Sequence, residues 1–458
     1  MEKNRSSFTG KLGFVLAAAG SAVGLGNLWR FPYLAAQHGG GIFLLVYIIL
    51  SVTFGFSLMI AEIAIGRKTG LSAIGAFQKL NKRYTFIGYI AALVPALILP
   101  YYSVIGGWVI KYLTVFVSGN VGKAATDGYF EGFIGNTWQS LLFFAIFIGL
   151  TAVVVLFGVE KGVEKVSKIM MPVLVVLSLG IAAYVCISNA IKGEWDGILY
   201  YIKPDFSNFS IMTVVSAMGQ LFYSMSLAMG IMITYGSYMK KEVSLESSAH
   251  QIEFFDMGIA FLAGLMIVPS VVSYSGIEGL NKGPGLMFIT LPKVFNEMGA
   301  VAGTILGAVF FILVLFAALT SSISLMETVV SIIQDKFHLE RKVTCLIVLG
   351  GAFVIGMPSA LGFGVWSGFT PLGMDILTFF DFVTNSVLMP IVAILTCLVV
   401  CYVIKPKAIV DEVNVSGKFK LAWLFKIMIY VAPLLLLVIL AFSIFEAFGI
   451  TFGGLLKF

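Results

Sequence analysis

Charged residues are scarce in this chain: only 11% of its 458 residues are Asp, Glu, Lys or Arg, whereas 59% are hydrophobic. Soluble domains carry about 25% charged residues, so the composition excludes an ordinary soluble domain and predicts a polytopic membrane protein. Cysteine and histidine are also rare, with four Cys and three His. Their scattered positions fit neither a zinc site nor a disulfide framework, and we expect a protein that is not an enzyme.

Eleven stretches without Asp, Glu, Lys or Arg are long enough to cross, or nearly cross, a bilayer of about 30 Å. Helices can extend past such limits into charged residues. The stretches are 12–29, 31–61, 84–110, 132–159, 169–191, 206–239, 257–277, 298–326, 343–374, 382–404 and 427–445.

The positive residues are distributed unequally between the two sides of these stretches. With the N-terminus in the cytoplasm, 21 Lys and Arg fall on the inner side and 6 on the outer side. By the positive-inside rule the N-terminus is predicted to be cytoplasmic and the C-terminus, after eleven crossings, extracellular. The net charge of +6 then reflects topology and gives no indication of nucleic-acid binding. We expect no cleavable signal peptide, because no small-residue cleavage site follows Leu12 onward, and we expect a location in the cell membrane.

The first stretch contains a run of poor helix formers, Gly20-Ser21-Ala22-Val23-Gly24-Leu25-Gly26-Asn27. Three glycines in seven residues, each costing roughly 1 kcal/mol against alanine, weaken the helix there. Two interpretations are open: small residues that allow close helix packing, or a broken helix whose freed carbonyls line a cavity.

The sixth stretch repeats this feature at Gly219–Gly230, where Ser224 and Ser226 lie in mid-helix. The two interrupted stretches begin two blocks of five, and because five is odd the blocks have opposite orientation. Such a pair favours the broken helix and indicates a transporter site at the membrane midplane. We predict an all-α single domain in which 1–186 and 209–404 are inverted five-helix repeats. An extracellular loop, 187–208, joins them, and 405–458 hold an inner loop and helix 11.

A few polar residues interrupt the other stretches. Asp256 opens the seventh, Asp381 interrupts the tenth, and Thr320 and Ser321 lie within the eighth. A carboxylate inside the membrane costs about 2.5–3.5 kcal/mol and should face a cavity or a cation. Glu62, near the inner end of the second stretch, either reaches water or caps amides that an opened neighbouring helix exposes.

These motifs resemble the neurotransmitter:sodium symporter family, in particular its bacterial amino-acid symporters with an inverted five-helix repeat. The resemblance covers residues 5 to 445 and is carried by GSAVGLGNLWRFPY (20–33), the glycines 39–41, AEIAIGR around Glu62, GQLFYSMSLAMG (219–230), ITYGSY (233–238) and AALTSS (317–322).

The resemblance implies two sodium sites. The first would be formed by the Ala22 carbonyl, Asn27, Ser224, Asp256 and the substrate carboxylate. The second would lie between the first and eighth helices, at the carbonyls of Gly20, Val23 and Ala317 and the hydroxyls of Thr320 and Ser321. Oxygen ligands of this kind suit a hard cation.

The resemblance also implies an amino-acid site. The substrate carboxylate would meet the Tyr102 hydroxyl and the amides near Leu25 and Gly26, at the positive end of a half-helix. Its ammonium would meet carbonyls near Ala22, Tyr223, Ser224 and Ser226. Its side chain would contact Ile98, Ile105, Met229, Ser321 and Leu325.

Two departures from relatives bear on the substrate and the ions. Asp256 stands where many relatives have Asn, and chloride-dependent animal members carry a Ser nearby. An anionic Asp256 supplies that negative charge, which predicts transport without chloride. Met229 stands where leucine-preferring relatives have Phe, and its adaptable side chain predicts a bulky aromatic substrate, with tyrosine or tryptophan favoured. The eleven-helix form also resembles bacterial tyrosine and tryptophan carriers.

The same resemblance implies gates on both sides of the site. Tyr223 would cover the substrate, and Arg30 with Asp381 would close the outer path. Arg5 with Asp335 would close the inner path near Tyr238, although Phe8 replaces a Trp that relatives often carry. The expected function is sodium-driven symport of a neutral amino acid by alternating access. The alternatives are a leucine-type symporter, a sodium-dependent amino-acid receptor and an ion channel.

Overall fold

The computed structural model describes residues 7–276 and 285–448, and within them the chain is almost entirely helical. Nine helices in this part of the chain are long and apolar enough to cross a membrane. They span Gly41–Thr69, Lys82–Val117, Thr137–Leu156, Val159–Lys192, Leu245–Ser275, Ala300–Phe337, Arg341–Leu361, Ile376–Val403 and Ala422–Phe445.

The two interrupted stretches are each divided into two helical parts. The first forms α1 (Lys11–Ala22) and the helical segment Gly26–Gln37, which ends with α2 (Phe31–Gln37), and the two parts are bent by 45°. The sixth forms α12 (Ile211–Ser224) and α13 (Ile231–Ser237), with an irregular segment between them. The structure therefore confirms an all-α fold in which the first and sixth helices are broken.

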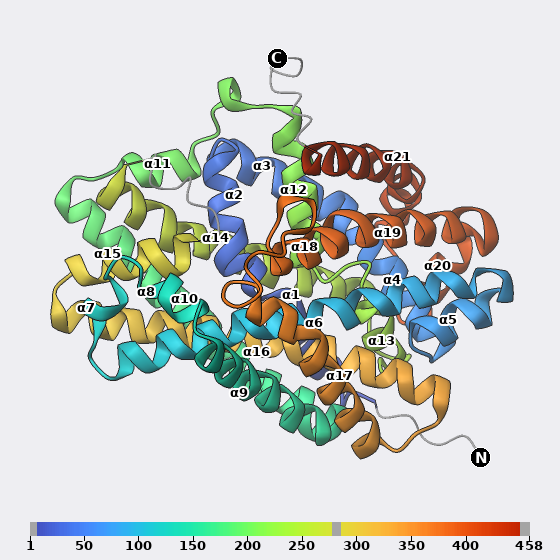
Figure 1. Cartoon of the computed structure of the whole chain (residues 1–458). Coiled ribbons are helices and arrows are strands. Elements are labelled where there is room, and N and C mark those ends of the chain that lie inside the picture. The colour runs from blue at the N-terminus through green and yellow to red at the C-terminus, as the bar shows by residue number, and fades with distance from the viewer. Residues whose placement is uncertain (1–6, 277–284, 449–458) are drawn as a thin grey trace.

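The labelled helices divide these spans and their connections further (Figure 1). The remaining bounds are α3 Gly41–Leu50, α4 Phe56–Thr69, α5 Ala73–Leu80, α6 Thr85–Val117, α7 Val121–Ala124, α8 Tyr129–Ile134, α9 Thr137–Leu156, α10 Lys165–Lys192, α11 Asp196–Ile202, α14 Leu245–Ser275, α15 Leu291–Glu297, α16 Ala300–Phe337, α17 Arg341–Leu361, α18 Ile376–Asp381, α19 Met389–Leu398, α20 Lys405–Asn414 and α21 Ala422–Ala447.

The broken helix α1 lies inside the bundle, whereas α9 and α21 lie at opposite edges of the view (Figure 1). Helix α1 packs against α10, α14 and α16, and ten of its twelve residues are buried. Its small side chains, such as Ala17, Ala18 and Ala19, allow neighbouring helices to approach closely. The break in α1 is therefore enclosed by protein, where freed backbone groups can be satisfied.

The glycine run 39–41 forms the turn between the first broken helix and the following span. Gly39 and Gly40 have positive φ angles of 96° and 60°. A Cβ atom on Gly40 would lie 2.2 Å from the Tyr200 carbonyl oxygen, so only glycine fits against α11.

Some helix limits differ from those expected. Asp256 does not open the seventh span but lies well inside α14, which begins at Leu245. The stretch 343–374 was too long, because α17 ends at Leu361 and Gly362 follows. Helix α10 continues to Lys192, so the connection to α11 begins later than residue 187. The absence of charged residues shows which stretches lipid tolerates. A helix, however, ends where its backbone groups find other partners, and the absence of charge does not indicate that position.

Candidate functional site

The break in the first helix follows from local backbone geometry. Helix α1 ends at Ala22, and Val23 is extended, with φ −79° and ψ 98°. The Asn27 side-chain oxygen then accepts a hydrogen bond from the Gly24 amide at 3.1 Å. The helix resumes beyond this turn, so the last carbonyls of α1 and the first amides of the next segment point into the protein rather than at each other.

The break in the sixth helix contains residues in the left-handed region, with φ 53° at Ser226 and 59° at Ala228. Contacts from other helices hold this segment. Ser226 Oγ donates to the Ser21 carbonyl at 2.9 Å, and Gln220 Nε2 donates to the Gly26 carbonyl at 2.8 Å. The two breaks are thus joined directly, although they are about 200 residues apart in the sequence.

Glu62 supports the second break from α4. Its Oε1 accepts a hydrogen bond from the Ala228 amide at 2.8 Å, and the side chain is fully buried. Of the two sequence interpretations, this geometry matches the cap on an exposed amide rather than a carboxylate that reaches water.

A cluster of oxygens joins α12, α14 and the segment after α1. Asn27 Nδ2 donates to Asp256 Oδ1 at 2.8 Å and lies 3.3 Å from Ser224 Oγ, which itself donates to Asp256 Oδ1 at 2.5 Å. The Tyr47 hydroxyl donates to Asp256 Oδ2 at 2.8 Å. All four side chains are buried. The structure therefore brings together three side chains of the expected first sodium site, and it adds Tyr47, which the sequence analysis did not identify.

A second group of oxygens lies between α1 and α16. Ser321 Oγ donates to the Ser21 carbonyl at 3.0 Å and lies 3.4 and 3.5 Å from the carbonyls of Gly20 and Val23. Thr320 Oγ1 lies 3.1 Å from the Ala317 carbonyl. The residues of the expected second sodium site therefore adjoin one another across the two helices.

A small cavity of about 20 Å³ lies at the junction of the two helix breaks and reaches Ser321 on α16. It is lined by Ser21, Ala22, Gly24, Gly26, Ile98, Tyr102, Tyr223, Ser226, Met229, Ile231, Ser321 and Leu325. Of the expected substrate-binding residues, Leu25 donates its amide to the lining residue Tyr102, whereas Ser224 and Ile105 are buried outside the lining. The lining also includes three residues that were not among the expected substrate-binding residues, namely Ser21, Gly24 and Ile231.

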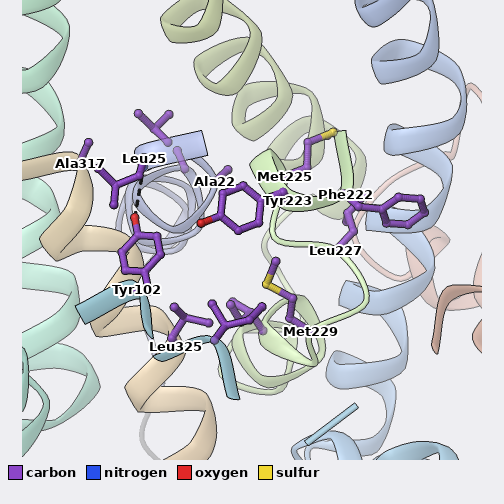
Figure 2. Packing of buried hydrophobic residues seen from close by; sticks show 14 of the residues in the cluster. Ala22, Leu25, Tyr102, Phe222, Tyr223, Met225, Leu227, Met229, Ala317 and Leu325 are labelled. Carbon is purple, nitrogen blue, oxygen red and sulfur yellow. Dashed lines mark hydrogen bonds between the residues drawn. The ribbon is translucent and has the colours of Figure 1, made fainter. Parts of the chain in front are cut away.

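One end of the cavity is polar and the other apolar (Figure 2). The Tyr102 hydroxyl accepts a hydrogen bond from the Leu25 amide at 3.2 Å. Met229 and Leu325 lie together on the side away from Leu25 (Figure 2). A space of this size holds about one water molecule, so an amino acid enters only when the walls move apart.

The proposed outer gate residues lie near one another without a direct ion pair in the described part of the chain. The Arg30 guanidinium lies over the Tyr223 ring, 5.5 Å from its centroid. Asp381 accepts hydrogen bonds from the Tyr101 hydroxyl at 3.1 Å and from Asn385 Nδ2. Tyr101, which the resemblance left without a role, thus holds Asp381 in place, and the gating roles stay predictions.

At the other end of the site, Arg5 lies outside the described residues. Its expected partner Asp335 accepts hydrogen bonds from the Ser72 amide at 2.8 Å and the Ser72 hydroxyl at 2.6 Å. The Tyr238 hydroxyl donates to Glu327 Oε1 at 2.9 Å, and Arg341 forms an ion pair with Glu327. Phe8, buried against the rings of Phe14, Tyr235 and Tyr238, covers this end of α1.

Comparison with known proteins agrees with this arrangement. The sequence model of the Sodium:neurotransmitter symporter family matches residues 5–129 and 132–455. The chain is 34% identical to the sodium-dependent transporter YhdH of Bacillus subtilis, over 96% of this chain and 97% of that protein. It is 32% identical to a sodium-dependent transporter of Haemophilus influenzae, over 97% and 99% of the two chains.

A solved structure, that of MhsT in complex with L-phenylalanine, superposes with a TM-score of 0.87. It is 34% identical and covers 96% of this chain and 100% of that one. This likeness includes the inverted five-helix repeat expected from the two broken helices. The chain therefore belongs to the sodium:neurotransmitter symporter family, as a multi-pass, sodium-dependent secondary transporter and not an enzyme.

Proposed function

We propose that this protein couples the inward movement of sodium to the uptake of a neutral, bulky hydrophobic or aromatic L-amino acid. Tyrosine or tryptophan is the favoured substrate, two sodium ions bind, and chloride is not required. The observation that carries this proposal is the junction of the two helix breaks. There, the Asn27–Ser224–Asp256 cluster adjoins a cavity that also presents the Tyr102 hydroxyl and the Leu25 amide.

The first sodium ion and the substrate carboxylate would share this junction. Asp256 supplies a full negative charge, and Asn27, Ser224 and the Ala22 carbonyl supply neutral oxygens. Asn27 presents its nitrogen to Asp256 and its oxygen to the Gly24 amide. A sodium ion would take the oxygen instead, so ion binding would release the turn at Gly24 and couple the ion to the shape of the broken helix.

The second sodium ion would lie between the end of α1 and α16, where Ser321 Oγ already lies within 3.5 Å of the carbonyls of Gly20, Ser21 and Val23. These carbonyls now accept from the Ser321 hydroxyl; in the proposed bound state they would coordinate the sodium ion instead. It would thereby fix α1 against α16, two helices that must separate if the site opens toward the N-terminal side.

The substrate side chain would occupy the apolar end of the cavity. Met229 and Leu325 lie there with Ile98 and Ile231. The unbranched Met229 side chain has three rotatable bonds and can turn aside for a large ring. The likeness to MhsT, whose structure was solved with L-phenylalanine, supports an aromatic substrate. A leucine-type substrate remains the alternative, because an aliphatic side chain also suits this lining.

Alternating access requires that the cavity open to one side at a time. We propose that Tyr223, Arg30 and Asp381 close the extracellular side, and that Arg5, Asp335 and Tyr238 close the cytoplasmic side. The N-terminus would be cytoplasmic and the C-terminus extracellular, in the cell membrane. The cavity of about 20 Å³ is smaller than an amino acid, so substrate binding would require the helices that line it to move apart.

Counterflow in sodium-containing proteoliposomes, with each of the twenty amino acids in turn, tests this proposal. We expect sodium-dependent exchange that is strongest for tyrosine or tryptophan and competition of both with labelled leucine. Binding without accumulation would indicate a receptor, and sodium currents far above the substrate flux would indicate a channel. Failure of both aromatic amino acids to compete would leave the aliphatic alternative.

A further inference from the structure

A large open groove of about 1000 Å³ lies apart from the substrate cavity, between the beginning of α1, the beginning of α14 and the segment 417–421 that precedes α21. Its apolar side is formed by Leu12, Val15, Leu16, Phe254, Phe255 and Leu421. Leu12 and Phe254 are 64% and 72% exposed. Both belong to helices that are apolar enough to form part of a membrane span, so we expect this side of the groove to face lipid rather than water.

The other side of the groove is polar and carries an excess of positive charge. Lys418 and Lys420 line it and are exposed. Lys11 Nζ reaches its edge by donating to Ser247 Oγ at 2.8 Å. These three lysines face one lining carboxylate, that of Glu246.

The carboxylate of Glu246 is not fully available to pair with these lysines, because it already accepts hydrogen bonds from backbone amides. It accepts hydrogen bonds at 3.1 Å from the amides of Lys420 and Leu421. This contact fixes the segment 417–421 against the start of α14 and holds the lysines at the end of the apolar surface. The groove therefore has a positively charged rim directly beside an apolar wall.

We propose that this groove binds an anionic phospholipid. The acyl chains would lie along Leu12, Leu16 and Phe254, and the phosphate would meet Lys418 and Lys420. The ligand must be amphiphilic and negatively charged, because the wall is apolar and the rim carries more lysines than carboxylates. Phospholipids present this chemistry at the end of a membrane span, where basic residues attract their headgroups.

The position of the groove connects lipid binding to the transport helices. Leu12 and Leu16 belong to α1, and Phe254 lies two residues before Asp256 on α14. A lipid in the groove would touch both helices and hold their ends in this relative position. Its binding does not depend on the identity of the amino acid, so it can be tested independently of the proposed function.

Native mass spectrometry of the full chain, purified in detergent with phosphatidylglycerol or phosphatidylcholine, tests the proposal. We expect one retained phosphatidylglycerol and weaker retention of phosphatidylcholine. Each lysine near an anionic lipid contributes roughly fivefold in affinity, so the double variant K418Q/K420Q should bind about 25-fold more weakly. The matched control is K407Q/K426Q, which removes two exposed lysines outside the groove lining.

A second pair of variants tests the apolar wall without a change of charge. F254Q should lower retention, whereas L434Q, at an exposed position of α21 outside the groove, should not. Equal losses in K418Q/K420Q and K407Q/K426Q would overturn the proposal. So would equal retention of the two lipids, or displacement of the lipid by millimolar inorganic phosphate, which would indicate a site for phosphate alone. Unchanged retention in F254Q would overturn the placement of the acyl chains.

Discussion

Glu62 on α4 and the Ala228 amide in the sixth-helix break form a buried hydrogen bond of 2.8 Å across 166 residues of sequence. Ala228 has a φ of 59°, a conformation that residues with a Cβ atom rarely adopt. The contact therefore supplies a partner for an amide that the broken helix cannot satisfy, and it fixes the break in a conformation that the local sequence alone disfavours.

Replacement of Glu62 tests this relationship. Glu62→Ala leaves the Ala228 amide buried without its acceptor, which costs about 1–3 kcal/mol of unfolding free energy. Glu62→Gln retains an acceptor oxygen and should cost clearly less. Thermal and denaturant unfolding of both variants in detergent measures the difference. Equal losses in Ala and Gln would show that the hydrogen bond is not what Glu62 contributes.

Asp256→Asn should weaken sodium affinity by roughly tenfold or more, because the affinity of an oxygen site depends on its number of charges. The matched control is Glu253→Gln, a buried carboxylate one turn earlier on α14 that contacts the His250 ring. Sodium dependence of substrate uptake measures the change. In the parent protein, replacing chloride with gluconate should leave uptake unchanged. Uptake that vanished in gluconate, or equal effects of the two variants, would contradict a charged ligand at Asp256.

Met229→Phe should reverse the preference for large substrates. A rigid ring at the apolar end of the cavity removes the space into which the methionine can turn, and shape differences of this size change specificity by roughly tenfold or more. The ratio of tryptophan to leucine uptake is the measurement, since a general loss of stability would lower both rates together. An unchanged ratio would place the substrate side chain elsewhere.

Gly24→Ala should abolish coupled uptake. A Cβ atom there would lie 2.4 Å from Ser321 Oγ and 3.0 Å from the Tyr102 hydroxyl oxygen. It would therefore separate two groups assigned to sodium and to the substrate carboxylate. Gly258→Ala on α14 is the control, because its Cβ atom would meet nothing within 4 Å. Sodium-driven uptake at equal protein amounts compares the two, and wild-type uptake by Gly24→Ala would argue against a substrate beside this glycine.

Asp335→Ala should favour the form that is open toward the cytoplasm, if Asp335 closes the inner path with Arg5. Asp335 also accepts hydrogen bonds from Ser72, at the beginning of α5. Ser72→Ala removes only the hydroxyl contact and serves as the control. Labelling of a single cysteine placed in the inner path reports accessibility. Similar labelling of both variants would assign Asp335 to the support of α5 rather than to a gate.

Much of the site was accessible from the sequence because the residues that carry it are unusual in a membrane helix. Glycines and serines in mid-span, and a carboxylate such as Asp256, are costly there unless they serve a site. Tyr47 gave no such signal. A tyrosine in an apolar stretch is common, and only the tertiary structure shows that the Tyr47 hydroxyl donates to Asp256 on α14. Ser21 and Gly24 were within the recognised motif, but their place in the cavity depends on the angle at which the helix breaks.

The sequence by itself determined that the chain is a bundle of membrane helices with two broken members, because lipid tolerates only apolar surfaces and intrahelical hydrogen bonds. It did not determine where α14 begins or α17 ends. It also did not determine whether the gate residues touch. Asp381 turns to Tyr101 and Asn385, while Arg30 lies over Tyr223. Tertiary structure decided these partners, because each polar group within the bundle bonds to whichever acceptor the packing of distant helices brings into reach.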